Sequence, residues 1–153
     1  MGNLTLSGYL AAAISVAFSG TQTLASLAND EWCDLSDAID NGTNKYALAD
    51  FELVLGSAAF TGTDSTIALY LVPSVDGTNY GDWTGNVTTA QQQNQPYYVG
   101  SFTTSGTTAA QRLTLRDIPL PNGLFKLAVR NLSNVAFAAS GNTLKYRPHT
   151  VTV

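Results

Sequence analysis

Five carboxylates near the start of the chain are the first candidates for chemistry: Asp30, Glu31, Asp34, Asp37 and Asp40. A calcium-binding loop needs oxygen ligands at closely alternating positions, with a glycine at the bend. The last three of these aspartates instead recur at every third residue, which does not match the EF-hand pattern. We therefore expect a solvated acidic loop here, and no metal site.

A catalytic set is equally hard to assemble from the other reactive residues. Asp50 and Glu52 lie two positions apart and would share one solvent-facing side of a strand, whereas a glycosidase needs two carboxyls flanking its substrate. His149 is the only histidine and Cys33 the only cysteine, and no Gly-x-Ser-x-Gly elbow is present. We expect Cys33 to be a small buried residue. The sequence predicts a protein that is not an enzyme and that uses no cofactor.

Aromatic residues beside turns are stronger candidates, and they favour binding. The apolar run Ile67–Val72 meets Pro73, which cannot donate to a sheet, and Asp76-Gly77 then favours a tight turn. The aromatic side chains that follow would either contact a sugar or a protein partner, or close the end of the core. They are Tyr80, Trp83, Tyr97 and Tyr98.

Short strands are the elements that must position these residues. Runs of β-branched, aromatic and alternating apolar residues are separated by clusters of Gly, Asn, Asp, Ser and Pro. Eight or nine such runs with almost no helical signal predict an all-β fold, a two-sheet antiparallel β-sandwich of the jelly-roll type. The expected strands are about Leu10–Phe18, Thr21–Leu27, Tyr46–Ala59, Thr66–Val72, Tyr97–Phe102, Arg112–Ile118, Leu124–Asn131, Val135–Ala139 and Leu144–Val153.

Three segments are less regular. Thr23–Ile39 is either a short helical turn, which Asn29 would cap, or an irregular loop. Tyr9–Phe18 is apolar like the centre of a signal peptide, but no Lys or Arg precedes it, so a strand is the better prediction. It is also too short to span a membrane. Gly85–Gln95 is polar and uncharged, which is typical of a long loop.

The composition limits the class of partner. The chain has 153 residues, enough for one domain with a substantial core, and only 12% of them are charged. Its net charge is −4, and its seven Lys and Arg residues are scattered apart from Lys145 and Arg147. Without a basic stripe to neutralise phosphates, we predict no nucleic-acid partner. A lone cysteine fits a reducing cytoplasm or a fold that does not rely on disulfides.

With these residues in view, the chain resembles virion structural proteins of tailed bacteriophages, in particular the small head decoration, or cement, proteins. The resemblance covers about residues 21–153, which would form a single jelly-roll domain. Residues 1–20 would then be an N-terminal arm or an extra edge strand. The phrases that carry the resemblance are Ala38–Thr43, Tyr70–Tyr80, Leu120–Phe125, Val135–Phe137 and Asn142–Pro148.

The resemblance implies a homotrimer on the outer capsid surface, made in the cytoplasm of the host bacterium. There it would clamp neighbouring major capsid subunits, with the major capsid protein and its own copies as partners and no membrane involved. Leu4, Leu6 and Tyr9 are the arm residues expected to contact a partner, together with the four aromatic residues named above. The alternative function is a carbohydrate- or receptor-binding module of a phage tail or fibre.

Overall fold

Four nested pairs of antiparallel strands organise the chain in a computed structural model, which describes residues 5–6, 12–60, 65–81 and 97–152. β2 pairs with β9, β3 with β8, β4 with β7 and β5 with β6, so each pair encloses the next along the sequence. This nesting is the strand plan of a jelly roll. The strands are β1 (Thr5–Leu6), β2 (Ile14–Ser15), β3 (Ile39–Asp40), β4 (Leu48–Leu55), β5 (Thr66–Pro73), β6 (Tyr98–Thr103), β7 (Gln111–Pro119), β8 (Leu124–Leu132), β9 (Thr143–His149) and β10 (Val151–Thr152).

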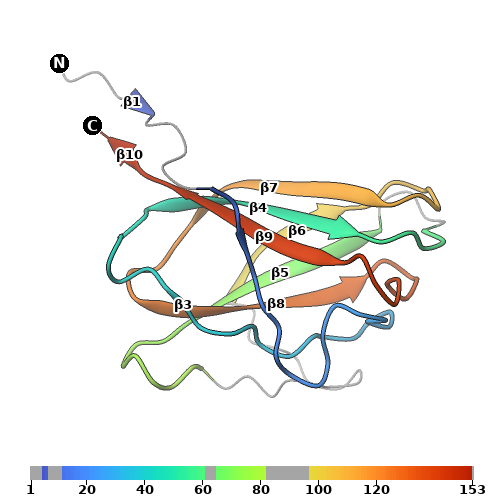
Figure 1. Ribbon diagram of the computed structural model, residues 1–153, viewed down its shortest axis with the longest axis horizontal. Coiled ribbons are helices and arrows are strands. Elements are labelled where there is room, and N and C mark those ends of the chain that lie inside the picture. Colours follow the sequence, from blue (N-terminus) through green and yellow to red (C-terminus); the bar gives the residue numbers. More distant parts are fainter. Residues whose placement is uncertain (1–4, 7–11, 61–64, 82–96, 153) are drawn as a thin grey trace.

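The eight nested strands form two antiparallel sheets, in the orders β2-β9-β4-β7 and β3-β8-β5-β6. In Figure 1, β5 and β6 of the second sheet are drawn fainter and pass behind the first sheet. The predicted all-β sandwich is therefore confirmed, and the described residues include no helix. A third, two-stranded sheet joins β1 to β10, and this ribbon extends beyond the end of the two layers, beside both chain ends (Figure 1).

The core lies between the two four-stranded sheets. Alternate residues of each strand point inward, because successive side chains of a strand lie on opposite faces. Burying one such large apolar side chain contributes about 1.5–3 kcal/mol. Three of the four interior strands, β4, β5 and β8, supply most of the fully buried side chains. Examples are Phe51, Leu53, Leu55, Ile67, Leu69, Phe125, Leu127 and Val129.

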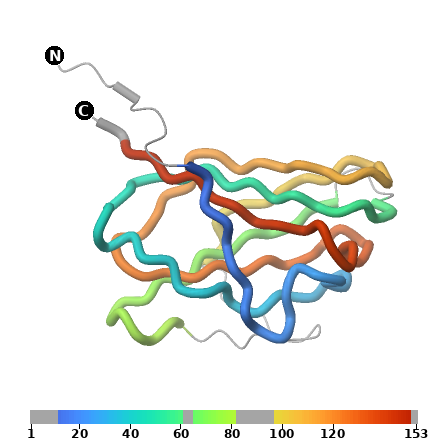
Figure 2. The backbone as a smooth tube through the Cα atoms, viewed as in Figure 1, coloured from blue at the N-terminus to red at the C-terminus, as the bar shows by residue number. Residues whose placement is uncertain are grey.

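The segment between β2 and β4 is irregular rather than helical. The tube in Figure 2 follows it from the β2-β9 edge of one sheet across to the β8 edge of the other. Along β8 its main chain donates from Cys33 to Val129 O and from Ser36 to Leu127 O, at 3.0 and 2.8 Å. Only Ile39–Asp40 there is regular enough to count as β3. Of the two alternatives for this region, the irregular loop is the one observed.

Two predicted strands, Thr21–Leu27 and Val135–Ala139, are not strands. Both segments still bury apolar side chains, including Leu27 and Phe137. Their apolar content resembles that of strands, but no regular ladder forms. Two main-chain bonds, from Ser26 N–H to Ala138 O and from Phe137 N–H to Leu27 O, join the segments at 3.0 Å each, and a side-chain amide adds further bonds. The Asn131 amide donates to Leu27 O and Val135 O at 2.9 and 2.8 Å. Apolar content alone therefore predicted burial correctly and the backbone conformation wrongly.

Candidate functional site

The outer face of the β2-β9-β4-β7 sheet gathers charges that lie far apart in the sequence. Residues of β4, β7 and β9 line a depression of about 430 Å³ on this face. Lys145 and Arg147 of β9 lie here, and so do Arg112 and Arg116 of β7. Four of the seven Lys and Arg residues therefore share one surface. We call it the charged face. It comprises Asp50, Glu52, Arg112, Arg116, Asp117, Lys145, Arg147 and His149.

Two ion pairs cross from β4 to β7 on the charged face. Arg112 Nη1 lies 2.7 Å from Glu52 Oε1, and Arg116 Nε lies 3.7 Å from Asp50 Oδ2. Both arginine side chains are largely exposed, so water screens the pairs and each adds little stability. Asp50 and Glu52 share one strand face, as the sequence indicated. Asp50, however, is only 8% exposed and does not simply face solvent.

A β-bulge in β7 covers Asp50. The register between β4 and β7 shifts at this point, so that Arg116 and Asp117 both face the single residue Asp50. Asp117 has a left-handed φ of 56° and donates its main-chain N–H to Asp50 Oδ1 at 2.9 Å. The bulge thus places two carboxyl groups side by side on the charged face.

His149 completes a cluster of three side chains that can each donate a metal ligand. It is the last residue of β9, on the other side of β4 from β7, and its Nε2 lies 3.1 Å from Asp117 Oδ1. Ligand atoms of Asp50, Asp117 and His149 all lie within 4.8 Å of one another. The sequence predicted none of the three as a ligand. They are 67 and 32 positions apart, and only the strand order brings them together.

The outer face of the other sheet carries an aromatic cluster. The ring centroids of Trp32 and Tyr70 are 4.5 Å apart, and those of Tyr70 and Tyr98 are 5.7 Å apart. The Arg130 guanidinium lies 5.1 Å from the Trp32 ring and forms an ion pair with Asp30. Trp32 and Tyr70 are each 4% exposed, whereas Tyr98 is 45% exposed. Tyr98 is therefore the exposed member of this cluster.

A hydrogen-bonded turn holds Tyr80 near the same sheet. Asp76 Oδ1 accepts the main-chain N–H groups of Thr78 and Asn79 at 2.8 and 2.7 Å. These hydrogen bonds, of which those from Asn79 have the largest effect, hold the pKa of the Asp76 carboxyl well below its usual range. The ring of Tyr80 lies under Lys126 Nζ, 4.7 Å from it. The turn expected at Asp76-Gly77 is present, with Gly77 at a φ of 77°.

The predicted partner-binding residues fall into four groups. Tyr98 is exposed, and Tyr80 is half-buried beside Lys126. Tyr97 is partly buried against the core. Leu6 lies in β1, of which only the backbone is described. The other three, Leu4, Tyr9 and Trp83, lie outside the described residues, as does the segment Gly85–Gln95.

The early carboxylates act as structural ties. Asp34 Oδ2 accepts the main-chain N–H of Gln22 at 2.9 Å, and Asp37 Oδ2 accepts the hydroxyl of Ser19 at 2.8 Å. Each bond fixes the chain after β2 to the segment that runs along β8. These contacts give Asp34 and Asp37 a structural role.

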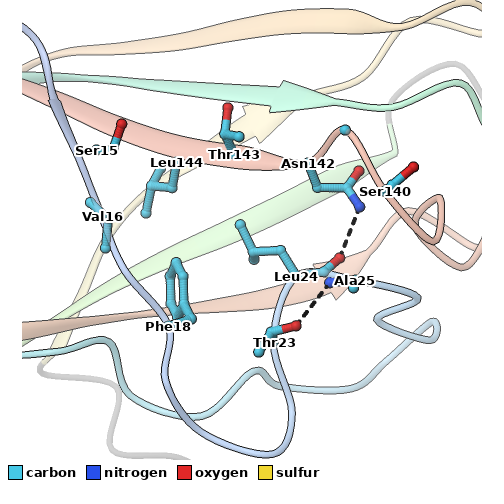
Figure 3. A pocket seen from close by; sticks show the side chains of 11 residues that line it. Ser15, Val16, Phe18, Thr23, Leu24, Ala25, Ser140, Asn142, Thr143 and Leu144 are labelled. Carbon is cyan, nitrogen blue, oxygen red and sulfur yellow. Dashed lines mark hydrogen bonds between the residues drawn. The ribbon is translucent and has the colours of Figure 1, made fainter.

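A groove of about 270 Å³ opens where the chain after β2 meets the turn before β9. Phe18, Leu24 and Leu144 project toward its centre in Figure 3. At its edge the Asn142 amide donates to Leu24 O at 3.0 Å (Figure 3). The groove is therefore apolar in its middle, and this amide at its edge is already engaged within the protein.

No helix within the described residues is long and apolar enough to cross a membrane. Comparisons of the chain with protein-family models, with curated proteins and with solved structures each give no match. The geometry of the two sheet faces and of the terminal ribbon is therefore what any assignment of function must use.

Proposed function

We propose that this protein is a non-enzymatic decoration protein of a tailed-phage capsid, which binds the outer surface of the head and stabilises contacts between major capsid subunits. The single observation that carries the proposal is the β1–β10 ribbon, a strand pair that no third strand extends within the described residues. The resemblance in sequence supplies the virion setting and the homotrimer.

The ribbon is too small to be stable alone. It consists of two residue pairs, Thr5 with Thr152 and Leu6 with Val151, and within the described residues no third strand joins it. Isolated two-stranded ladders are marginal in water even when they are much longer. A neighbouring protein that adds a strand to the ribbon would bond the main-chain groups along its outer edge. On a capsid that neighbour is a major capsid subunit or another copy of this chain.

The low charge of the surface supports docking of this kind. Only 12% of the residues are charged, and four of the seven basic ones lie on the charged face. Main-chain hydrogen bonds can then supply affinity where few side-chain charges are available. Many copies on one shell add further affinity through multivalency.

Capsid binding tests the proposal directly. Purified protein should co-sediment with capsids of the encoding phage that lack it, and should raise the temperature at which they release DNA. Deleting residues 1–11 should abolish both effects and leave the sandwich folded, whereas Asn44→Ala, at an exposed loop residue, should change neither. Failure of the wild-type protein to bind such capsids would refute the proposal.

The second candidate is a carbohydrate- or receptor-binding module of a phage tail or fibre. It is favoured by Tyr98, a residue that is 45% exposed and whose hydroxyl lies 2.6 Å from Ser101 Oγ. Exposed aromatic rings of this kind can stack on a sugar. Binding on a glycan array that is lost in Tyr98→Ala, with no binding to capsids, would select this function instead.

A further inference from the structure

The cluster on the charged face has the composition of a metal site. Asp50, Asp117 and His149 come from the three adjacent strands β4, β7 and β9. Carboxylate oxygen and imidazole nitrogen are the usual non-sulfur ligands of Zn²⁺ and of related first-row cations. Three protein ligands with further positions left for water are typical of open sites.

The spacing of the ligand atoms also fits. Metal–ligand bonds of about 2.0–2.2 Å place neighbouring ligand atoms roughly 3.0–3.5 Å apart. His149 Nε2 and Asp117 Oδ1 are already 3.1 Å apart, and the Asp50 oxygen lies within 4.8 Å of both. An oxygen of Asp50 must come closer to the other two atoms when all three bind one cation.

Two of the three side chains are held firmly. Asp50 and His149 are 8% and 7% exposed, and the N–H of Asp117 fixes Asp50 Oδ1 at 2.9 Å. Asp117 sits on the bulge, with its side chain 64% exposed. The site is therefore fixed at its base and open to solvent on one side, which gives a cation a way in.

We infer that Asp50, Asp117 and His149 bind one divalent first-row transition-metal cation, such as Zn²⁺. The cation replaces the hydrogen bond between His149 and Asp117 and ties β7 and β9 together across β4. Because His149 is the last residue of β9, the cation also anchors the strand end from which β10 and the ribbon emerge. The inference does not depend on the proposed function.

The surrounding charges predict how the affinity can be changed. Arg116 lies 3.7 Å from Asp50 Oδ2, and Arg147 is paired in the ladder with Asp50. Both arginines oppose a cation. Arg116→Gln should therefore tighten binding about fivefold, as expected for removal of one partly screened charge. A purely structural role of the cluster would not produce this gain.

Isothermal titration calorimetry with Zn²⁺ tests the site, on protein freed of any histidine tag and of metal. We expect one Zn²⁺ per chain and a rise in Tm on binding. Asp117→Asn keeps a side chain that tolerates the left-handed φ, and His149→Gln keeps a donor toward Asp117. Each should weaken Zn²⁺ binding by at least about tenfold. Replacing even a residue that only hydrogen-bonds to a metal ligand typically lowers metal affinity by about 10- to 100-fold.

Glu52→Gln is the matched control, since it removes a carboxylate from the same face of β4, outside the cluster. It should bind Zn²⁺ as the wild type does. The inference fails if the wild type shows no binding up to about 1 mM Zn²⁺, the concentration that marks negligible affinity. It also fails if Asp117→Asn and Glu52→Gln bind Zn²⁺ with the same affinity. If His149→Gln does not fold, this comparison is sufficient to test the inference.

Discussion

The Sγ atom of Cys33 accepts a hydrogen bond from the main-chain N–H of Val129, at 3.1 Å. The thiol thereby satisfies a group of β8 that a regular neighbouring strand would otherwise bond. Cys33 is fully buried, and burial, the largest effect, raises the pKa of its thiol from 9.0 to about 12. The cysteine is a structural acceptor, and its thiol stays protonated at neutral pH.

The raised pKa predicts a loss of stability in alkali. The unfolded thiol loses its proton from about pH 9 upward, whereas the folded thiol keeps it until about pH 12, so rising pH favours the unfolded state. Burial raises the pKa values of Tyr70 and Tyr146 as well, which acts in the same direction. Urea denaturation above pH 9 should show stability falling by up to about 1.4 kcal/mol per pH unit from the thiol alone. Cys33→Ala should flatten this slope, and an unchanged slope would contradict the prediction.

Asn131 should be among the costliest residues to replace. Its side chain is fully buried, and its amide group bonds two loop carbonyls while its Oδ1 accepts from the N–H and hydroxyl of Ser133. Asn131→Ala leaves these partners buried without bonds, so we expect it to lose about 3 kcal/mol of unfolding free energy. Asn44→Ala, at an exposed position, should stay within about 0.5 kcal/mol. Chemical denaturation of both variants checks the difference.

Alanine substitutions at two glycines should distinguish the stability lost to a steric clash from the stability lost to an unfavourable backbone conformation. A Cβ on Gly56 would lie 2.3 Å from Ser140 O, which is backbone and cannot move aside cheaply. Gly56→Ala should therefore lose at least about 2 kcal/mol. Gly77 has open space around it but a φ of 77°, so Gly77→Ala should lose only about 1 kcal/mol and Gly77→Asn less. Equal losses for Gly56→Ala and Gly77→Ala in thermal denaturation would be evidence against the packing at Ser140.

The Arg112–Glu52 pair should contribute little despite its short distance. The arginine side chain is 67% exposed and the glutamate side chain 29%. A double-mutant cycle with Arg112→Gln and Glu52→Gln should give a coupling of about 0.2–1 kcal/mol, which falls as salt is added. A salt-independent coupling above this range would mean that the pair is better shielded from water than its exposure indicates.

The strand pattern in the sequence predicted most of the fold but little of the candidate site. Period-2 alternation was visible in Leu124–Val129 and in Arg112–Ile118, because alternating residues of one strand face opposite sides of the sheet, and both segments are strands in the structure. β3 was not predicted. In the segment that leads into it, the side chains of Cys33 and Ser36 accept main-chain hydrogen bonds from β8 in place of part of a ladder, and no periodic sequence pattern marks such a segment. The Asp50–Asp117–His149 cluster was invisible for another reason, since it depends on a bulge and on strand order.

The nested pairing also limits the order in which the strands can pair. Ile14 of β2 pairs with Tyr146 of β9, whereas the innermost pair joins Thr66 of β5 to Thr103 of β6. During synthesis on the ribosome β2 emerges long before its partner has been made, and it stays unpaired until β9 follows. The first strand of the sandwich to be translated is thus the last to be paired, and the high contact order of this plan predicts slow refolding.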